Sequence, residues 1–259
     1  MAFERTSRQN FFGVSALLFA ASTAVTIVWG ASMSTMSDMQ MPGGWSMSMT
    51  WMPGQDWSGA TLSFLGMWVV MMISMMMPSL VPMLLKYRQA IGTKSNGPVG
   101  WLSVLVGAGY FFVWTVFGIA VFPLGIALAT AEMQLPALAR AVPVAVGIVV
   151  LFAGLLQFTG WKAQQLVCCR QAAGCSSIIS VSAGRAWLQG LRFGLHCIQC
   201  CFGLIIILLV IGVMDLRMMA VVAAAITVER LAPAGLHIAR TTGALAAGAG
   251  LFLIARAVF

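Results

Sequence analysis

Long runs of hydrophobic residues alternate with short polar connections along this chain. A helix needs about 20 apolar residues to cross the hydrocarbon core of a bilayer. Seven runs approach or exceed that length, so the pattern predicts an all-α protein, a polytopic transmembrane bundle of about seven helices. The predicted segments are Phe11–Ala31, Gly59–Leu85, Val99–Ala129, Ala141–Trp161, Gly194–Met214, Leu216–Glu229 and Thr241–Val258.

The sixth and seventh segments carry the weakest signal. Ala220–Ile226 is apolar, but Glu229 and Arg230 follow soon after it. The last segment is near the minimum spanning length and carries Arg256 close to its end. The pattern therefore leaves open whether both segments cross the membrane completely.

Composition supports a membrane protein and argues against a soluble domain. Hydrophobic residues make up 61% of the 259 residues and charged residues 8%, which is far from the balance of soluble domains. We expect one integral membrane domain over residues 1–259, with an external Met-rich loop at 32–58 and a cytoplasmic Cys-containing loop at 162–193. The net charge of +8 does not indicate nucleic-acid binding, because the basic residues are spread over short loops.

The distribution of these basic residues predicts the orientation. With the N-terminus in the cytoplasm, only Arg140, Arg217 and Arg256 fall outside. Cytoplasmic loops carry the excess of Lys and Arg in membrane proteins, so we expect the N-terminus inside and the end of the seventh segment outside. The first segment also resembles a signal peptide, but its apolar run is too long and lacks a clear cleavage site. We therefore expect a retained anchor.

Soft metal ligands gather at the start of the fifth segment, in the sequence HCIQCC that begins at His196. On a helix Cys197, Cys200 and Cys201 share one face, and His196 borders that face. Thiolate and imidazole ligands favour Cu(I), with Zn(II) second. The alternative is that cysteine serves here as a small apolar residue of a buried helix. Three cysteines with an adjacent histidine favour the metal site.

Methionine forms a second pattern, with 19 residues in the chain. Thioethers are soft, neutral ligands that favour Cu(I). A single methionine is more often an apolar filler, but these residues are grouped in the polar external loop and along the second predicted helix. The external candidates are Met33, Met36, Met39, Met47 and Met49, and the helical candidates are Met71, Met72, Met75 and Met76.

The two patterns are expected to meet within the membrane. The second helix runs inward and the fifth starts inside, so Met75 and Met76 lie at about the same depth as Cys200 and Cys201. If these helices touch, a mixed Met/Cys/His site forms in the inner half of the membrane. Glu229 lies near this site, either as a functional carboxylate or in an ion pair with Arg230 or Arg192.

All six cysteines fall on the cytoplasmic side in this orientation. A reducing compartment favours free thiols or metal thiolates over disulfides. Cys168 and Cys169 are secondary metal candidates, as a second site or a collection point for an ion. Adjacent cysteines ligate one tetrahedral ion awkwardly, so the pair alone is a weak signal.

Three motifs occur together in this chain: Trp68-x-x-Met71-Met72-x-x-Met75-Met76-Met77-Pro78, Lys162-x₅-Cys168-Cys169-Arg170, and His196-Cys197-x-x-Cys200-Cys201 with the later Gly212-Val213-Met214-Asp215-Leu216. In this combination the chain resembles a large bacterial family of predicted metal-binding integral membrane proteins of unknown function. The resemblance implies a multi-pass protein of the bacterial cytoplasmic membrane with a metal site, and it supplies no activity. Typical members carry a CxxCR-like loop where this chain has Cys168-Cys169-Arg170.

The patterns favour a protein that binds and handles Cu(I) for uptake, delivery or storage, and that is not an enzyme. The sequence contains no Gly-rich phosphate-binding motif and no Ser/His/Asp or paired-carboxylate arrangement. Expected partners are membrane lipids and either the subunits of a membrane complex or a copper-dependent enzyme, with no nucleic acid. Copper is the expected metal, zinc is the second choice, and haem is not expected.

Two other functions stay open. The chain could be a non-catalytic accessory subunit of a respiratory, monooxygenase or photosynthetic assembly, where a helical His196 could ligate a haem or pigment. A membrane thiol oxidoreductase using Cys197 and Cys200 is the third reading. It is the weakest, because a helix buried in lipid gives a partner disulfide poor access.

Overall fold

The computed structural model describes residues 2–34, 39–40, 46–47, 56–92, 99–170, 182–212 and 215–258. Within these ranges the chain forms eight α-helices and a ladder of two short antiparallel strands, β1 (Met39–Gln40) and β2 (Ser46–Met47). The predicted all-α class is confirmed. The helices are α1 (Ala2–Ser34), α2 (Trp57–Gly92), α3 (Val99–Gln134), α4 (Pro136–Leu156), α5 (Gly160–Arg170), α6 (Ala183–Ile211), α7 (Leu216–Leu231) and α8 (Gly235–Val258).

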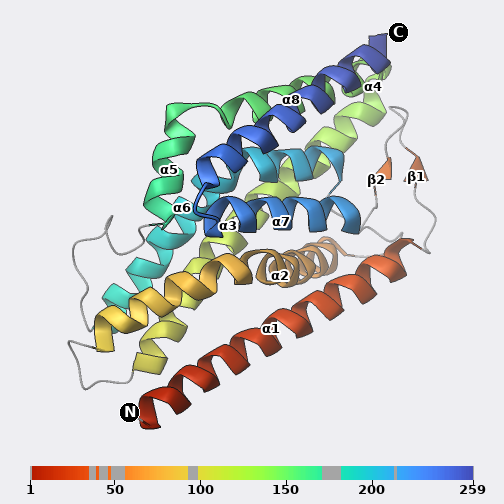
Figure 1. The fold of residues 1–259 in the computed structure, drawn as a ribbon. Helices are drawn as coiled ribbons and strands as arrows, with labels where there is room; N and C mark the ends of the chain where they lie inside the picture. Colours follow the sequence, from red (N-terminus) through yellow and green to blue (C-terminus); the bar gives the residue numbers. More distant parts are fainter. Residues whose placement is uncertain are drawn as a thin grey trace.

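Six of the described helices are long and apolar enough to cross a membrane, and they suggest a multi-pass membrane protein. They are α1, α2, α3, α4, α6 and α8. The sixth predicted segment, α7, has 16 residues, which at about 1.5 Å per residue falls short of the roughly 30 Å hydrocarbon core. In Figure 1, α7 nevertheless lies alongside the long helices, and the N- and C-termini lie at opposite ends of the bundle.

Several helices extend beyond the apolar runs that predicted them. The connection expected at 162–193 contains most of α5 and the first turns of α6. The start of α6 is amphipathic, with Ala186, Gly190 and Phe193 buried along one face, so helical packing continues where hydropathy has already fallen.

The fourth predicted segment, Ala141–Trp161, breaks after Leu156. There α5 begins as a separate helix, whose Lys162 backbone N–H donates to the Thr159 hydroxyl at 3.3 Å.

The core of the bundle is built around α3 and α6. α3 packs against both α2 and α6, and α4 packs against α6 and α8. Close approach depends on glycine: an added Cβ at Gly109 of α3 would meet the Trp187 carbonyl of α6 at 2.7 Å. α7 fits between α2, α6 and α8. Helices from distant parts of the sequence therefore meet near the middle of the molecule.

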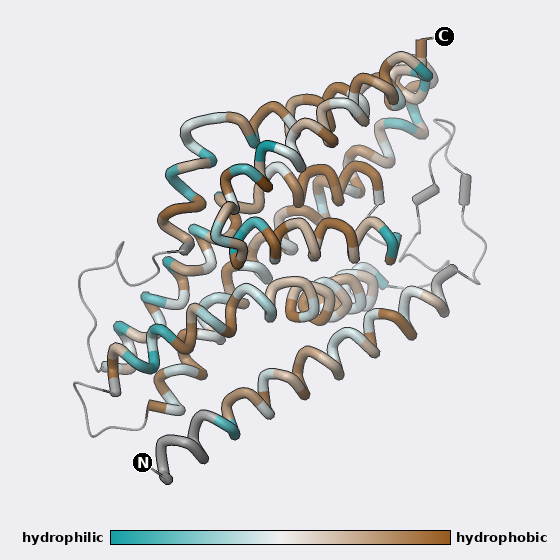
Figure 2. Tube along the Cα trace, viewed as in Figure 1, coloured by the Kyte–Doolittle hydropathy of each residue, from teal (hydrophilic) through white to brown (hydrophobic). Residues whose placement is uncertain are grey.

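The outer surface is apolar. Leu17, Phe152, Leu245 and Phe252 are among many large hydrophobic side chains that are more than half exposed, and Figure 2 shows hydrophobic residues along most of the helix length, with hydrophilic segments nearer the helix ends and in α5. Soluble monomers rarely expose apolar patches of this extent. The surface is suited to contact with lipid chains.

Candidate metal site

The methionine stripe of α2 faces the interior. Met71, Met72, Met75 and Met76 are each at most 2% exposed. Their spacing places them on one side of the helix, and that side packs into the core rather than toward lipid. A thioether in this position is shielded from water and available to a soft ligand partner inside the bundle.

The cysteines of α6 are buried against the same core. Cys197, Cys200 and Cys201 are free thiols at most 2% exposed. The Cys197 thiol points at the Met76 sulfur, with Sγ and Sδ 3.8 Å apart. The predicted meeting of the methionine and cysteine patterns is therefore realised at this pair, on helices that are far apart in sequence.

A third helix contributes a hydroxyl to this contact. Tyr110 of α3 is completely buried, and its Oη lies 2.8 Å from Cys197 Sγ. Sequence analysis did not identify Tyr110, although a tyrosine in the middle of an apolar span was a usable signal, because a buried phenol normally finds a hydrogen-bond partner. The packing of α3 against α6 determines which cysteine Tyr110 contacts. The spacing of residues in the sequence does not predict that packing.

The Met76–Cys197 separation fits a shared soft ion. Two sulfurs that bind one metal at roughly 2.3 Å stand roughly 3.8–4.0 Å apart in tetrahedral or trigonal geometry. Across the described residues, no group of three or more His, Cys, Asp or Glu side chains is arranged to hold a metal ion. A thioether such as that of Met76 would add a soft donor to fewer than three thiol or imidazole ligands, and thioether sulfur favours Cu(I) over Zn(II).

His196 occupies the edge of the cluster. Its side chain is half-buried, and its Nδ1 is buried without a hydrogen-bond partner. Buried polar nitrogens are normally hydrogen-bonded. An unpaired imidazole nitrogen on the helix that carries the three thiols is a candidate ligand, and its role as a ligand stays a prediction.

The two cysteines of α5 differ from each other. Cys168 is disulfide-bonded, so the expectation of free thiols is wrong for this residue, and its sulfur is not available as a thiolate ligand in this form. Cys169 is a free thiol that donates to the His196 carbonyl at 3.3 Å. A hydrogen bond with Cys200 and burial raise the pKa of the Cys169 thiol. Because α5 packs against α6, Cys169 joins the cluster and Cys168 does not.

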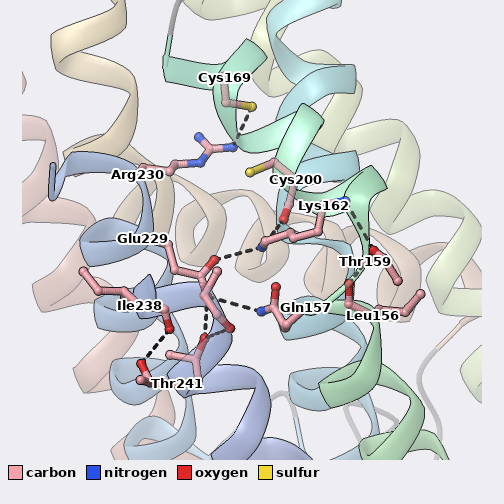
Figure 3. Close-up of polar contacts among 12 residues, drawn as sticks. Leu156, Gln157, Thr159, Lys162, Cys169, Cys200, Glu229, Arg230, Ile238 and Thr241 are labelled. Carbon is pink, nitrogen blue, oxygen red and sulfur yellow. Dashed lines mark hydrogen bonds and ion pairs between the residues drawn. The ribbon is translucent and has the colours of Figure 1, made fainter. Parts of the chain in front are cut away.

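Charged side chains surround the cysteines (Figure 3). Arg230 of α7 donates from Nη2 toward Cys169 Sγ at 3.7 Å and toward the Cys197 carbonyl at 3.5 Å. Lys162 of α5 donates to the Cys200 carbonyl at 2.6 Å and pairs with Glu229 at 2.8 Å. Two cations thus lie against the backbone that carries the thiols.

Glu229 has an ion-pair partner that the sequence did not predict. Its carboxylate pairs with Lys162, and it also accepts from Gln157 at 3.2 Å and from Thr242 at 2.6 Å. Sequence analysis assigned Lys162 to an exposed loop, whereas the residue is only 4% exposed. Helix α5 is separate from α4 and places Lys162 beside the backbone of the α6 cysteines. The hydropathy pattern did not predict the break between α4 and α5.

The structure describes only part of the external methionine group. Met33 belongs to the last turn of α1, and Met39 pairs with Met47 in the β1–β2 ladder. Met36 and Met49 fall outside the described residues. No ligand role for this group follows from the described part of the chain.

Comparison with known proteins gives one match. The family model PpoB2, described as a copper chaperone, matches residues 65–253. That range runs from the third turn of α2 into α8, and so includes the whole Met/Cys cluster. No curated protein and no solved structure matches the chain.

Proposed function

The chain belongs to the copper chaperone family PpoB2, and we propose that it holds Cu(I) inside a membrane-embedded helical bundle and delivers it to a copper-accepting partner. The proposed ligands come from Met76 and Cys197, with further sulfur from Cys200, Cys201, Met71, Met72 and Met75 and with His196 at the edge. The N-terminus is proposed to face the cytoplasm of a bacterial cell, as the distribution of basic residues indicates.

The observation that carries this proposal is the 3.8 Å contact between Met76 Sδ and Cys197 Sγ. A thioether and a thiol from two helices meet in a region where both residues are at most 1% exposed. Soft sulfur donors without carboxylate oxygens favour Cu(I) and disfavour Mg(II) and Ca(II). Burial also keeps water and oxidants away from the ion.

Tyr110 and Arg230 supply a hydrogen-bond donor and a positive charge to a buried thiolate. Metal binding displaces the thiol proton, and the negative sulfur that remains is costly to bury without a partner. The Tyr110 hydroxyl, 2.8 Å from Cys197 Sγ, can donate to that sulfur. The Arg230 guanidinium, which contacts the Cys197 carbonyl, adds positive charge beside a site in which thiolates would otherwise outnumber the single charge of Cu(I).

Delivery is proposed over storage because the family is described as a chaperone. The alternative of a non-catalytic accessory subunit leaves the Met76–Cys197 contact and the unpaired His196 nitrogen without a role. It predicts a folded protein with no affinity for copper.

The test is the copper content of the full chain purified anaerobically in detergent. The wild-type protein is expected to hold near-stoichiometric copper after Cu(I) is offered and the excess removed. A Cys197/Cys200/Cys201→Ser triple variant is expected to lose it, and Met76→Leu to lose about tenfold in affinity, which corresponds to about 1.4 kcal/mol.

Met67→Leu is the matched control, because Met67 lies on the same helix and is also buried, at 6% exposed, but belongs to no contact of the cluster. Helical content by circular dichroism checks that each variant is folded. Folded wild-type protein that takes up no Cu(I) would contradict the proposal, as would equal losses in Met76→Leu and Met67→Leu.

A further inference from the structure

A pocket of about 350 Å³ lies beside the sulfur cluster, where α2, α5 and α7 meet. Its size is at the lower end of the range for small-molecule sites. The lining residues are Ser79, Pro82, Met83, Lys86, Cys169, Arg230, Leu231, Ala232 and Pro233. All of them belong to the described part of the chain.

Cys169 belongs to both the pocket and the cluster. It lines the pocket, while its thiol donates to the His196 carbonyl of α6 at 3.3 Å. In Figure 3, Cys169 projects from α5 toward the Arg230 guanidinium, and the Cys200 sulfur lies near that same group. A soft ion arriving in the pocket would meet the Cys169 sulfur before the buried thiols of α6.

The positive charge of the pocket wall favours an anionic ligand. Arg230 and Lys86 line the pocket, and none of its described lining residues is acidic. The Arg230 guanidinium donates to Ser79 Oγ at 3.2 Å and toward Cys169 Sγ at 3.7 Å, but its Nε is buried without a partner. Guanidinium groups pair preferentially with carboxylates, so the unpaired donor marks a position for an acceptor.

We propose that this pocket is the port through which Cu(I) enters the cluster, bound to a small carboxylate-bearing thiol, with Cys169 as the first protein ligand. The inference rests on the proposed function and adds the chemical class of the copper donor. Arg230 holds the donor's carboxylate. The apolar wall formed by Pro82, Met83 and Leu231 contacts the rest of the molecule.

Entry is a ligand exchange without change of oxidation state. The bond between copper and the donor's sulfur breaks as a bond to Cys169 Sγ forms. The proton of the Cys169 thiol passes to the departing thiolate, which leaves as a neutral thiol group on the donor. In the second exchange the bond to Cys169 Sγ breaks as a bond to an α6 thiol sulfur forms, the proton of that thiol returns to Cys169, and copper remains Cu(I) throughout.

Anaerobic loading of the full chain from two donors tests this port. One donor is Cu(I) complexed with excess glutathione, which is an anionic thiolate complex, and the other is the cationic tetrakis(acetonitrile)copper(I) ion. Initial rates are followed by thiolate-to-copper absorbance in the ultraviolet, and final copper contents by elemental analysis. Arg230→Gln and Cys169→Ala are compared with wild type and with Arg217→Gln, a control at the other end of α7.

The ratio of the glutathione rate to the acetonitrile rate is expected to fall about tenfold in Arg230→Gln, because the charge that attracts and holds the anionic donor is gone. The ratio stays at the wild-type value in Arg217→Gln. Cys169→Ala is expected to load copper from glutathione about tenfold more slowly than wild type. Its final copper content is expected to match that of wild type, because Cys169 binds the ion only during entry.

An unchanged rate ratio in Arg230→Gln would overturn the port, as would a wild-type loading rate in Cys169→Ala. Both outcomes leave the proposed function intact, because wild-type protein still binds copper. If wild-type protein takes up copper from neither donor, the proposed function fails and the port fails with it.

Discussion

Three helices meet at the sulfur of Cys197. Met76 of α2 lies 3.8 Å from it and Tyr110 of α3 lies 2.8 Å from it. At the residue scale, helical spacing was enough to predict that the α6 cysteines share a face and that the methionines form a stripe. Tyr110, Lys162 and their partners could not be predicted, because each contact joins residues more than 35 positions apart and depends on how helices pack.

Tyr110→Phe tests the role of the hydroxyl on Cys197. Hydrogen bonds to charged groups contribute about 1.5–3 kcal/mol, so the loss of this donor is expected to weaken Cu(I) binding at least about tenfold. Competition with the chromophoric chelator bicinchoninate measures the affinity. Tyr87→Phe is the control, because the Tyr87 hydroxyl is buried without a hydrogen-bond partner. Equal affinities in the two variants would show that the Tyr110 hydroxyl does not act on the bound ion.

At the element scale, the short helix α5 and the glycine contacts between long helices determine where the site lies. Hydropathy predicted the positions of the long helices because each contains a long apolar run. It missed α5, whose 11 residues are neither apolar enough nor long enough to give a spanning signal. α5 nevertheless brings Lys162 under the Cys200 carbonyl and Cys169 against His196.

The Lys162–Glu229 pair is expected to hold α5 and α7 together beneath the cysteines. Both side chains are at most 5% exposed. Glu229→Gln or Lys162→Met leaves a buried charge unpaired and is expected to destabilise the fold by about 3–5 kcal/mol, whereas the double variant recovers part of that loss. Thermal unfolding in detergent, followed by circular dichroism, measures the effect. Additive losses in the double variant would contradict direct pairing.

Two neighbouring glycines of α8 give a matched test of helix packing. A Cβ added at Gly250 would meet the Leu151 backbone nitrogen of α4 at 2.5 Å, whereas a Cβ at Gly248 meets nothing within 4 Å. Gly250→Ala is expected to cost about 1–3 kcal/mol through overpacking, and Gly248→Ala to be neutral or slightly stabilising because alanine favours helix. The same thermal assay compares them, and equal melting temperatures would argue against the close α4–α8 contact.

At the scale of the whole molecule, the arrangement of helices relates to how many times the chain crosses the membrane. The N- and C-termini lie at opposite ends of the bundle, and α7 lies between its neighbours although it has only 16 residues. Hydropathy and the distribution of basic residues predict seven crossings, while length and composition identify six candidate spans in the described residues. The difference is α7, which packs against α2, α6 and α8 on its buried face and carries the exposed side chains of Val221 and Val228 on another.

Reporter fusions after Phe259 distinguish the two topologies. With the N-terminus inside and α7 crossing, alkaline phosphatase fused there is expected to be active and a green fluorescent protein to be dark, because phosphatase matures outside the cytoplasm. A fusion after Gly92, at the end of α2, is expected to give the reverse. Bright fluorescence at both positions would mean that α7 does not cross.

The central claim is that Cu(I) is held by sulfur donors from α2 and α6. X-ray absorption at the copper edge of the anaerobically loaded protein measures it directly. We expect an edge typical of Cu(I) and a first shell of two or three sulfurs at roughly 2.3 Å, with a lower sulfur count in Cys197→Ser and in Met76→Leu. A first shell of nitrogen and oxygen only, or a spectrum unchanged in both variants, would contradict it.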